Sequence, residues 1–364
     1  MSLSKQALAL KYRPRVFDDL TEQESIKTIL STQIRTGTIK NGYLFTGPAG
    51  CGKTTSARIF ADMINNHKGL PIELDAASNN SVDDIRSICE QAQTRALDSE
   101  YKVFILDEVH VLSNQAWQAM LKTLEEPPMK SVFILCTTNP EKIPQTILSR
   151  VQRYNFQKIG LDGIVQRLEY ILKAEADEFC DTHGNDFMSV DEYMSEGGYE
   201  WEPEALHLLA KLANGGMRDA ITLTDKCLSY SHHLTEANVV AALGVADYGV
   251  MFELNNSLFT ENSTECLRII DDVYNSGIDL KQFMKTYFEF VLDVRKYELL
   301  RSFSHIKIPT TYEEELSSYG DAEYGVMEKL LKELLDLNHQ IKWEKDCKPY
   351  IEARMLLFIE GVFA

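Results

Sequence analysis

A glycine-rich string of eight residues constrains this chain more than any other feature. Residues 47–54 read Gly-Pro-Ala-Gly-Cys-Gly-Lys-Thr and match the pattern G-x-x-x-x-G-K-[ST] without a gap. A short apolar strand is predicted before the string, at 43–46, and a helix after it, up to Ile64. A strand, a glycine-rich turn and a helix in this order are the context that a phosphate-binding loop requires.

The loop predicts which of its groups contact the phosphates of a nucleotide and which contact its metal ion. Glycines let successive backbone N–H groups point at an anion, and the helix N-terminus adds the positive end of its dipole. Lys53 is expected to contact the β- and γ-phosphates, and the Thr54 hydroxyl to ligate Mg²⁺. The candidate nucleotide-binding residues of this segment are Gly47, Pro48, Ala49, Gly50, Cys51, Gly52, Lys53, Thr54 and Thr55.

A second apolar strand, predicted at 102–107, ends in two acids. Central parallel strands are apolar throughout, and their carboxyl ends open on the ligand crevice. We therefore expect Asp107 to hold Mg²⁺ through water and Glu108 to act as the general base on the attacking water. Taken without the phosphate loop, the pair would be better interpreted as solvated acids at a strand end.

A third apolar strand, at 132–137, ends in Thr137, Thr138 and a turn. A hydroxyl there could bond the γ-phosphate or the lytic water, although ordinary turn chemistry also explains the sequence. Arg150 and Arg218 are candidates for stabilising charge on a transferring phosphoryl group. By spacing alone, either arginine is more typical of a surface salt bridge.

The order of elements predicts the fold class. Strands at 43–46, 71–75, 102–107, 132–137 and 152–156 alternate with helical patterns at 22–36, 53–65, 82–97, 114–126 and 144–148, which favours an α/β fold with a parallel sheet. Ser81 is expected to cap the helix at 82–97. From Leu161 the apolar period becomes 3.6, which predicts helices only. The first of them is marked by Ile164, Leu168, Ile171 and Leu172. The predicted domains are an ATPase domain at 1–158, a helical lid at 159–244 and an all-helical collar at 245–364.

Strings spread over residues 11–219 carry a family resemblance. They include Lys-Tyr-Arg-Pro at 11–14, the phosphate loop, Asp-Glu-Val-His at 107–110, Glu-Glu-Pro-Pro at 125–128, and Gly-Met-Arg-Asp at 216–219. In this order they resemble the gamma/tau-type ATPase subunits of bacterial clamp loaders, within the AAA+ family. The resemblance implies that the lid and collar belong to one subunit of a five-subunit ring.

The resemblance also assigns roles to single residues. Tyr12 and Pro14 resemble the adenine-pocket segment, and Thr138 resembles the polar sensor of the γ-phosphate. Arg150 resembles the arginine finger that is given to the neighbouring subunit, and Arg218 resembles a second sensor on the lid. Lys122 resembles a basic residue that faces DNA, although it could equally be a lysine on a helix surface.

The function implied by the resemblance is ATP-dependent loading of a DNA sliding clamp. The implied cofactors are ATP and Mg²⁺, and the partners are the sliding clamp, the other loader subunits and primer–template DNA, with no membrane. One alternative is a ring scaffold that does not hydrolyse ATP, which the intact phosphate loop disfavours. The other is a different AAA+ machine, such as a branch-migration motor or a replication factor C-type small subunit.

The sequence departs from the family pattern in its cysteines. The bacterial subunits usually carry a four-cysteine zinc module after the phosphate-loop helix, whereas residues 64–71 here join the helix to the next strand directly. The seven cysteines are scattered, and no C-x-x-C pair exists. We therefore predict no zinc. A divergent or phage-encoded version of the subunit fits this departure.

Charge is distributed unevenly along the chain. The net charge is −18, yet residues 1–172 carry 20 basic and 19 acidic groups, against 17 and 36 in residues 173–364. The first part can therefore hold local basic surface for a phosphate backbone. Ten acids without Lys or Arg fall at 174–202, which predicts a solvated or partner-contacting loop inserted in the lid. An incomplete calcium-loop pattern at 181–192 lacks its glycine.

Features of cellular location are few. Unpaired cysteines suit a reducing compartment. Lys5 and Lys11 flank only a short apolar stretch at the N-terminus, so no signal peptide is expected there. We expect a cytoplasmic protein of a bacterial cell or of a phage-infected host.

Overall fold

The computed structural model describes residues 6–183, 193–194, 197–243 and 248–363. The chain divides into two compact units, Met1–Tyr193 with Leu209–Asp225, and Met194–Leu208 with Lys226–Ala364. The first unit thus joins the α/β part to much of the lid. The three-domain division expected from the sequence stays a prediction.

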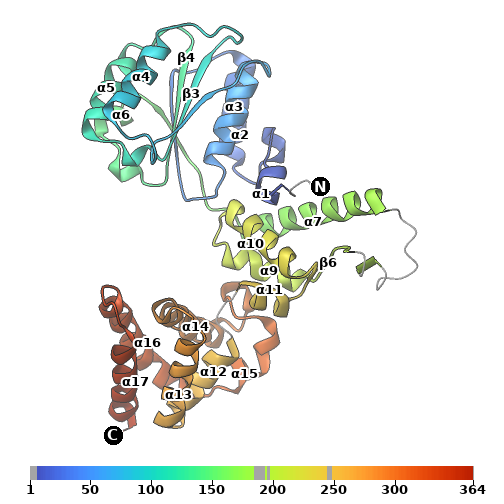
Figure 1. Cartoon of the computed structure of the whole chain (residues 1–364), viewed down its shortest axis with the longest axis vertical. Helices are drawn as coiled ribbons and strands as arrows, with labels where there is room; N and C mark the ends of the chain where they lie inside the picture. Colours follow the sequence, from blue (N-terminus) through green and yellow to red (C-terminus); the bar gives the residue numbers. More distant parts are fainter. Residues whose placement is uncertain (1–5, 184–192, 195–196, 244–247, 364) are drawn as a thin grey trace. The chain divides into compact units, whose positions relative to one another are not determined.

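A five-stranded parallel sheet forms the centre of the first unit (Figure 1). Its spatial order is β2-β3-β4-β1-β5. All seven residues of β4 are buried, as expected for a central parallel strand. Since the strands are parallel, β1, β3 and β4 all end at the same edge of the sheet. The strands are β1 (Gly42–Thr46), β2 (Ile72–Asp75), β3 (Lys102–Asp107), β4 (Ser131–Thr137) and β5 (Gln152–Asn155).

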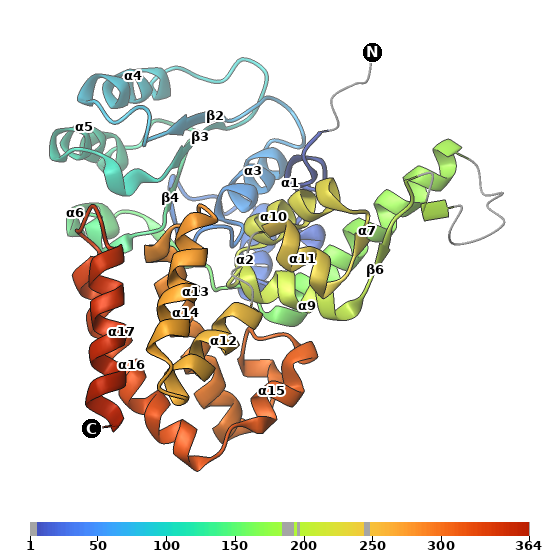
Figure 2. The ribbon, with the colours of Figure 1, turned by 60° about the horizontal axis from the view of Figure 1, so that its bottom comes forward.

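Helices cover both faces of this sheet, with one apolar core beneath each set (Figures 1 and 2). Leu44 and Phe45 are neighbours in β1 and belong to opposite cores, which is the alternation of a strand. This arrangement confirms the predicted α/β fold class. One face carries α2 (Glu24–Thr36) and α3 (Lys53–Ile64), and the other carries α4 (Val82–Ala92), α5 (Asn114–Glu125) and α6 (Gln145–Leu148).

The helix predicted over 82–97 is shorter than expected. Ser81 caps its N-terminus, as predicted, by accepting a hydrogen bond from the backbone N–H of Asp84 at 3.2 Å. The helix ends at Ala92, which is buried, whereas the next large apolar residue, Leu97, is fully exposed. Without an apolar side chain to pack beyond Ala92, the helix gains no tertiary support for another turn.

The helix α7 (Leu161–His183) extends further than the sequence suggested. Ile164, Leu168, Ile171 and Leu172 form its buried stripe, as predicted. The helix continues through 174–183, so the prediction that the acidic segment is a loop is wrong for these residues. Most of the incomplete calcium-loop pattern lies outside the described residues.

Further elements complete the N-terminal part and the lid region. A two-stranded parallel ribbon, β6 (Glu200–Trp201) with β7 (His233–Leu234), was not predicted. The helices are α1 (Leu8–Lys11) near the N-terminus, then α9 (Pro203–Leu212), α10 (Met217–Tyr230) and α11 (Glu236–Leu243).

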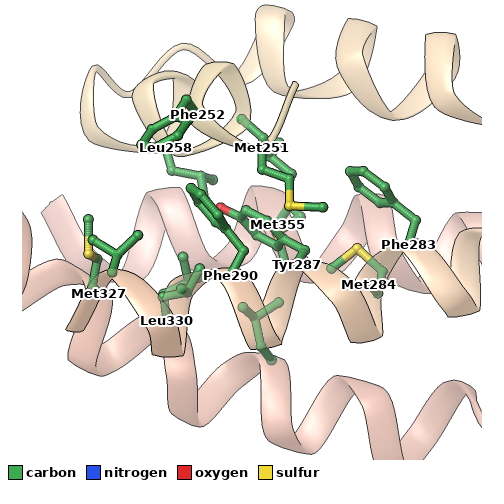
Figure 3. Close-up of a cluster of buried hydrophobic side chains, with 14 of the residues drawn as sticks. Met251, Phe252, Leu258, Phe283, Met284, Tyr287, Phe290, Met327, Leu330 and Met355 are labelled. Atoms are coloured by element: carbon green, nitrogen blue, oxygen red, sulfur yellow. The ribbon is translucent and has the colours of Figure 1, made fainter. Parts of the chain in front are cut away.

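The second unit contains a helical core (Figure 3). Phe283, Tyr287 and Phe290 of α14 lie within it among methionine and leucine side chains. The hydroxyl of Tyr287 bonds Oδ1 of the fully buried Asn255. Its helices are α12 (Tyr248–Phe259), α13 (Ser263–Asn275), α14 (Leu280–Leu300), α15 (Glu313–Ser318), α16 (Asp321–Ile341) and α17 (Lys348–Phe363).

Within the part of the chain that the structure describes, no single helix is long and apolar enough to cross a membrane. Helices α11 and α12 have the length and apolar composition of a membrane span only when they are taken together, and the pair is bent by 84°. Met251, Leu254 and Leu258 of α12 are completely buried in the helical core.

Candidate nucleotide-binding site

The backbone of the phosphate loop requires glycine at defined positions. Gly47 has φ +148°, and a Cβ there would collide with the carbonyl oxygen of Phe156. Gly52 precedes the first residue of α3 and has φ +100°, a region that residues with side chains rarely adopt. The loop therefore has glycine, which lacks a side chain, both where it leaves β1 and where it enters α3.

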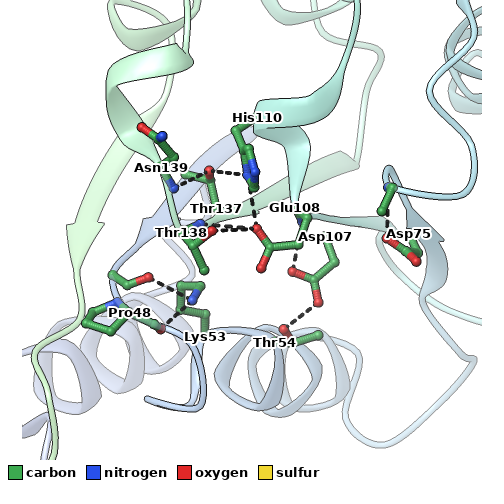
Figure 4. A network of polar contacts seen from close by, with 12 residues as sticks. Pro48, Lys53, Thr54, Asp75, Asp107, Glu108, His110, Thr137, Thr138 and Asn139 are labelled. Atoms are coloured by element: carbon green, nitrogen blue, oxygen red, sulfur yellow. Dashed lines mark hydrogen bonds and ion pairs between the residues drawn. The ribbon is translucent and has the colours of Figure 1, made fainter. Parts of the chain in front are cut away.

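Lys53 opens α3 and directs its side chain back into the loop (Figure 4). The residue is only 5% exposed, and Nζ donates to the carbonyl oxygens of Gly47 at 2.9 Å and Pro48 at 2.6 Å. The ammonium charge is therefore held by neutral acceptors at the centre of the loop. A phosphate oxygen would be a stronger acceptor, because both partners of the bond would then be charged.

Thr54 and Asp107 form the next contact toward β3. The Thr54 hydroxyl donates to Oδ2 of Asp107 at 2.7 Å, which brings together an alcohol and a carboxylate oxygen (Figure 4). Hard oxygen ligands of this kind are what Mg²⁺ prefers, with water and phosphate oxygens completing its coordination. These two residues therefore fit the magnesium site expected from the sequence.

Glu108 is held by a set of polar contacts at the end of β3. Its Oε2 accepts from the Thr138 hydroxyl at 3.0 Å and lies 3.0 Å from Nδ1 of His110 (Figure 4). The same Nδ1 lies 3.3 Å from the Thr137 hydroxyl. Glu108 also has φ +48°, an uncommon conformation for a residue with a side chain. The carboxylate is thus held in place by Thr138 and His110.

A cavity of about 400 Å³ lies beside the phosphate loop. Twelve residues that the sequence singled out line it: Tyr12, Pro14, Ala49, Gly50, Cys51, Gly52, Lys53, Thr54, Thr55, Asp107, Glu108 and Arg218. Nine more line it without having been predicted: Ala9, Arg13, Leu20, Thr21, Arg58, Ile159, Arg167, Met217 and Ile221. The lining therefore combines charged groups suited to phosphates with apolar and aromatic groups suited to a base.

Cys51 illustrates how closed the loop is. Its thiol is almost completely buried and lies 3.0 Å from the carbonyl oxygen of Pro48. Burial raises the pKa of this thiol, and the nearby Lys53 charge opposes the effect. Cys51 is therefore a packing residue of the loop, because a reactive cysteine needs a stabilised thiolate.

Arg218 lies at the start of α10 and reaches the cavity. The backbone N–H of Met217 donates to the carbonyl of Gly50 at 3.0 Å, which fixes the helix start against the phosphate loop. The sequence did not predict this backbone contact, since the two segments are far apart along the chain.

Arg150 lies elsewhere in the first unit and does not line the cavity. Its Nη1 donates to the carbonyl of Thr146 at 2.5 Å and to Ser149 Oγ at 3.0 Å, and Nη2 pairs with Glu125. Its side chain is 31% exposed. Arg150 therefore does not reach a nucleotide bound in the cavity of its own chain.

The helix α7 supplies site residues that the sequence reasoning missed. Arg167 Nη2 donates to the carbonyl of Tyr12 at 2.9 Å, and Glu175 Oε1 accepts from the Tyr12 hydroxyl at 2.8 Å. A signal for Glu175 existed, because it continues the 3.6-residue repeat that Ile164 and Leu168 begin. The acidic composition around it directed the interpretation toward solvent.

Comparison with known proteins identifies the family of this chain. Three family models match: "DNA polymerase III, delta subunit" at residues 63–160, "DNA polymerase III clamp loader subunit, ATPase lid domain" at 190–233, and "DNA polymerase III subunits gamma and tau domain III" at 234–322. A DNA polymerase III subunit tau of Bacillus subtilis is 32% identical over 97% of this chain. The chain belongs to the gamma/tau family of DNA polymerase III subunits.

The match to individual gamma/tau proteins is partial in length. The chain spans 63% of the Bacillus protein. A tau subunit of Escherichia coli is 33% identical over 76% of this chain and 43% of its own length. A gamma subunit of Buchnera aphidicola from Acyrthosiphon pisum is 29% identical over 80% of this chain and 81% of its own. This gamma/tau-type chain therefore corresponds to about half the length of the tau relatives.

One solved structure of a Thermotoga maritima RuvB variant superposes with a TM-score of 0.50 at 17% identity. It covers 82% of the gamma/tau-type chain and 99% of its own. At this identity the likeness shows the fold alone.

Proposed function

We propose that the protein is an ATP-binding and ATP-hydrolysing subunit of a DNA sliding-clamp loader. The observation that carries the proposal is the convergence of Lys53, Thr54, Asp107 and Glu108 on one cavity. A ring scaffold without hydrolysis would not need an acid after the metal ligand. Membership of the gamma/tau family supplies the replication context.

In this proposal the phosphates of ATP bind to the loop 47–54 and to Lys53. Thr54 and Asp107 would hold Mg²⁺, which neutralises charge on the phosphates. Glu108 would orient the attacking water and accept its proton. Thr138 would bond the γ-phosphate or that water, and the Thr138–Glu108 hydrogen bond keeps the two side chains adjacent.

Two arginines would complete the site from different chains. Arg218 lines the cavity of its own chain and would contact the phosphates there. Arg150 does not line that cavity, and its guanidinium is partly exposed, which supports a role at the site of a neighbouring subunit. A site built from two chains makes hydrolysis depend on assembly, because neither chain alone provides both arginines.

The partners in this proposal are the sliding clamp, the other subunits of a five-membered ring and a primer–template junction. Lys122 is an exposed residue of α5 and would face the DNA backbone. The near-neutral charge of residues 1–172 permits such local basic surface. The setting would be the cytoplasm of a bacterium or of an infected host.

The test is the ATPase rate of the assembled loader with and without primed DNA and the cognate clamp. We expect the clamp and DNA together to raise the rate, and Lys53→Ala to abolish both ATP binding and turnover. Thermal unfolding of the apo variant should match the parent, since the Lys53 ammonium contacts only loop carbonyls. A parent protein that neither binds ATP nor responds to clamp and DNA would contradict the proposal.

A further inference from the structure

Glu175 is a buried carboxylate that the proposed reaction does not use. It lies on α7 and is only 3% exposed. Its Oε1 accepts from the Tyr12 hydroxyl at 2.8 Å and from Lys11 Nζ at 2.5 Å. Lys11 also pairs with Glu178 on the same helix. A buried charge is retained at a cost unless it is paired, and here Lys11 provides the pairing.

The same helix holds Tyr12 at a second point. Arg167 lies about two turns before Glu175 and donates to the backbone carbonyl of Tyr12 at 2.9 Å. The backbone of Tyr12 and the far end of its ring are therefore both fixed to α7. In Figure 1 the short helix α1, which ends just before Tyr12, lies beside α7.

Tyr12 is one of the cavity residues that are suited to a base. Lys53 and Asp107 supply charges to the lining, whereas Tyr12, Pro14 and Ile221 supply an aromatic ring and apolar side chains. A tyrosine ring offers a flat apolar surface to a base only if its orientation is fixed. The contacts with α7 supply that restraint.

We propose that Glu175 is a positioning residue that holds Tyr12 in place for the base of the bound nucleotide. This inference rests on the proposed function, because it assumes that a nucleotide occupies the cavity. Glu175 acts through the Tyr12 hydroxyl, at the residue that would contact the base. It therefore affects ligands that carry a base and leaves ligands made of phosphate alone unaffected.

The protonation of the partners agrees with this arrangement. Burial raises the pKa of Tyr12, and the hydrogen bond to Glu175 raises it further, so the phenol remains a donor. Burial alone would lower the pKa of Lys11, yet its bonds to Glu175 and Glu178 raise it overall. The group thus keeps a protonated tyrosine and a charged lysine around one carboxylate.

The experiment compares two probes, ADP and inorganic tripolyphosphate, each with Mg²⁺ and measured by calorimetry on the full chain. We expect Glu175→Ala to weaken ADP binding by about tenfold, the effect of losing one hydrogen bond to a charged acceptor. Binding of tripolyphosphate should not change. The control is Glu169→Gln, which removes the charge of an acid on the same helix that pairs with Lys173 on the surface.

Two gentler variants keep the test decisive if Glu175→Ala fails to fold. Tyr12→Phe removes the donor of the contact, whereas Glu175→Gln keeps an acceptor oxygen but removes its charge, so both should weaken the contact and with it ADP binding. Their effects should not add in the double variant, because both disrupt the same hydrogen bond. Unchanged ADP affinity in folded Tyr12→Phe and Glu175→Gln, or equal losses for ADP and tripolyphosphate, would overturn the inference.

The controls separate this inference from the proposed function. If the parent binds ADP and Lys53→Ala does not, the nucleotide site stands, whatever the Glu175 variants do. If the parent binds neither probe, the proposed function itself fails, and the role of Glu175 fails with it.

Discussion

The hydroxyl of Thr138 donates a hydrogen bond to Oε2 of Glu108, with 3.0 Å between the two oxygens. The backbone N–H of Thr138 approaches the same oxygen at 3.3 Å. The proposed phosphate sensor and the proposed general base are therefore in direct contact. A phosphate or water that bonds the Thr138 hydroxyl would compete with Glu108 for it, which offers a physical route from ligand binding to the base.

Replacing Glu108 by glutamine should stop turnover and preserve binding. The amide has nearly the same shape and can still accept from Thr138, but it cannot take a proton from water. We expect ATP affinity to be unchanged and the steady-state rate to fall by about 100-fold or more. Single-turnover hydrolysis and ATP calorimetry measure the two effects. Near-normal turnover would remove Glu108 from its catalytic role.

Replacing Arg150 by alanine should impair only the assembled ring. The side chain lies outside its own chain's cavity, so nucleotide affinity of the isolated subunit should stay the same. Loss of an arginine that stabilises the transition state should slow hydrolysis in the ring by about 1,000-fold. In rings that mix Arg150→Ala with Lys53→Ala subunits, one class of interface combines an intact Lys53 from one subunit with an intact Arg150 from its neighbour. That class of interface should recover ATPase activity. A mixed ring no more active than either parent variant would contradict delivery to a neighbour.

Removing residues 184–196 and bridging the ends with a short Gly-Ser linker should preserve basal ATPase activity. The deletion starts after α7, because Glu175 and Glu178 on that helix hold Lys11 and Tyr12. A matched deletion that starts at Glu175 should weaken nucleotide binding. The two deletion proteins can be compared in one ATPase titration, and equal behaviour would show that the end of α7 has no role in the site.

The purified protein should contain no stoichiometric zinc. The sequence lacks any C-x-x-C pair, and the described residues contain no group of three or more His, Cys, Asp or Glu side chains placed to hold a metal ion. Elemental analysis after extensive dialysis makes the measurement. One zinc per chain that resists a chelator would contradict this expectation.

Replacing Tyr287 by phenylalanine should destabilise the helical core. Asn255 is fully buried, and its Oδ1 would lose the hydroxyl that now donates to it. An unsatisfied buried acceptor costs about 1–3 kcal/mol, which urea unfolding followed by circular dichroism can resolve. Tyr350→Phe is the matched control, since Tyr350 is about half exposed. Equal midpoints for the two variants would show that the Asn255 bond contributes little.

The contacts that could be predicted from the sequence lie within one continuous string or at the ends of parallel strands. Lys53 and Thr54 belong to one continuous string whose turn geometry brings them together. Asp107 and Glu108 follow from a buried strand, because parallel strands end at a common edge. Their partnership with the loop could be predicted since the rule concerns sheet topology and needs no knowledge of side-chain packing.

The contacts that the sequence did not predict join distant segments or short elements. Tyr12 and Glu175 are 163 residues apart, and no local pattern links a tyrosine to an acid at that distance. The strands β6 and β7 have two residues each, too few for any periodicity. The end of α4 was misjudged because helix propensity continued beyond the last residue that packs.

Position 47 should tolerate no variation in this lineage or in a laboratory library. Its backbone conformation is rare for any residue with a side chain, and the space that a Cβ would occupy is taken by the carbonyl oxygen of Phe156. Alanine, the smallest change, meets both obstacles. A neighbouring substitution at Phe156 could not relieve the collision, because the obstructing atom belongs to the main chain that every residue shares.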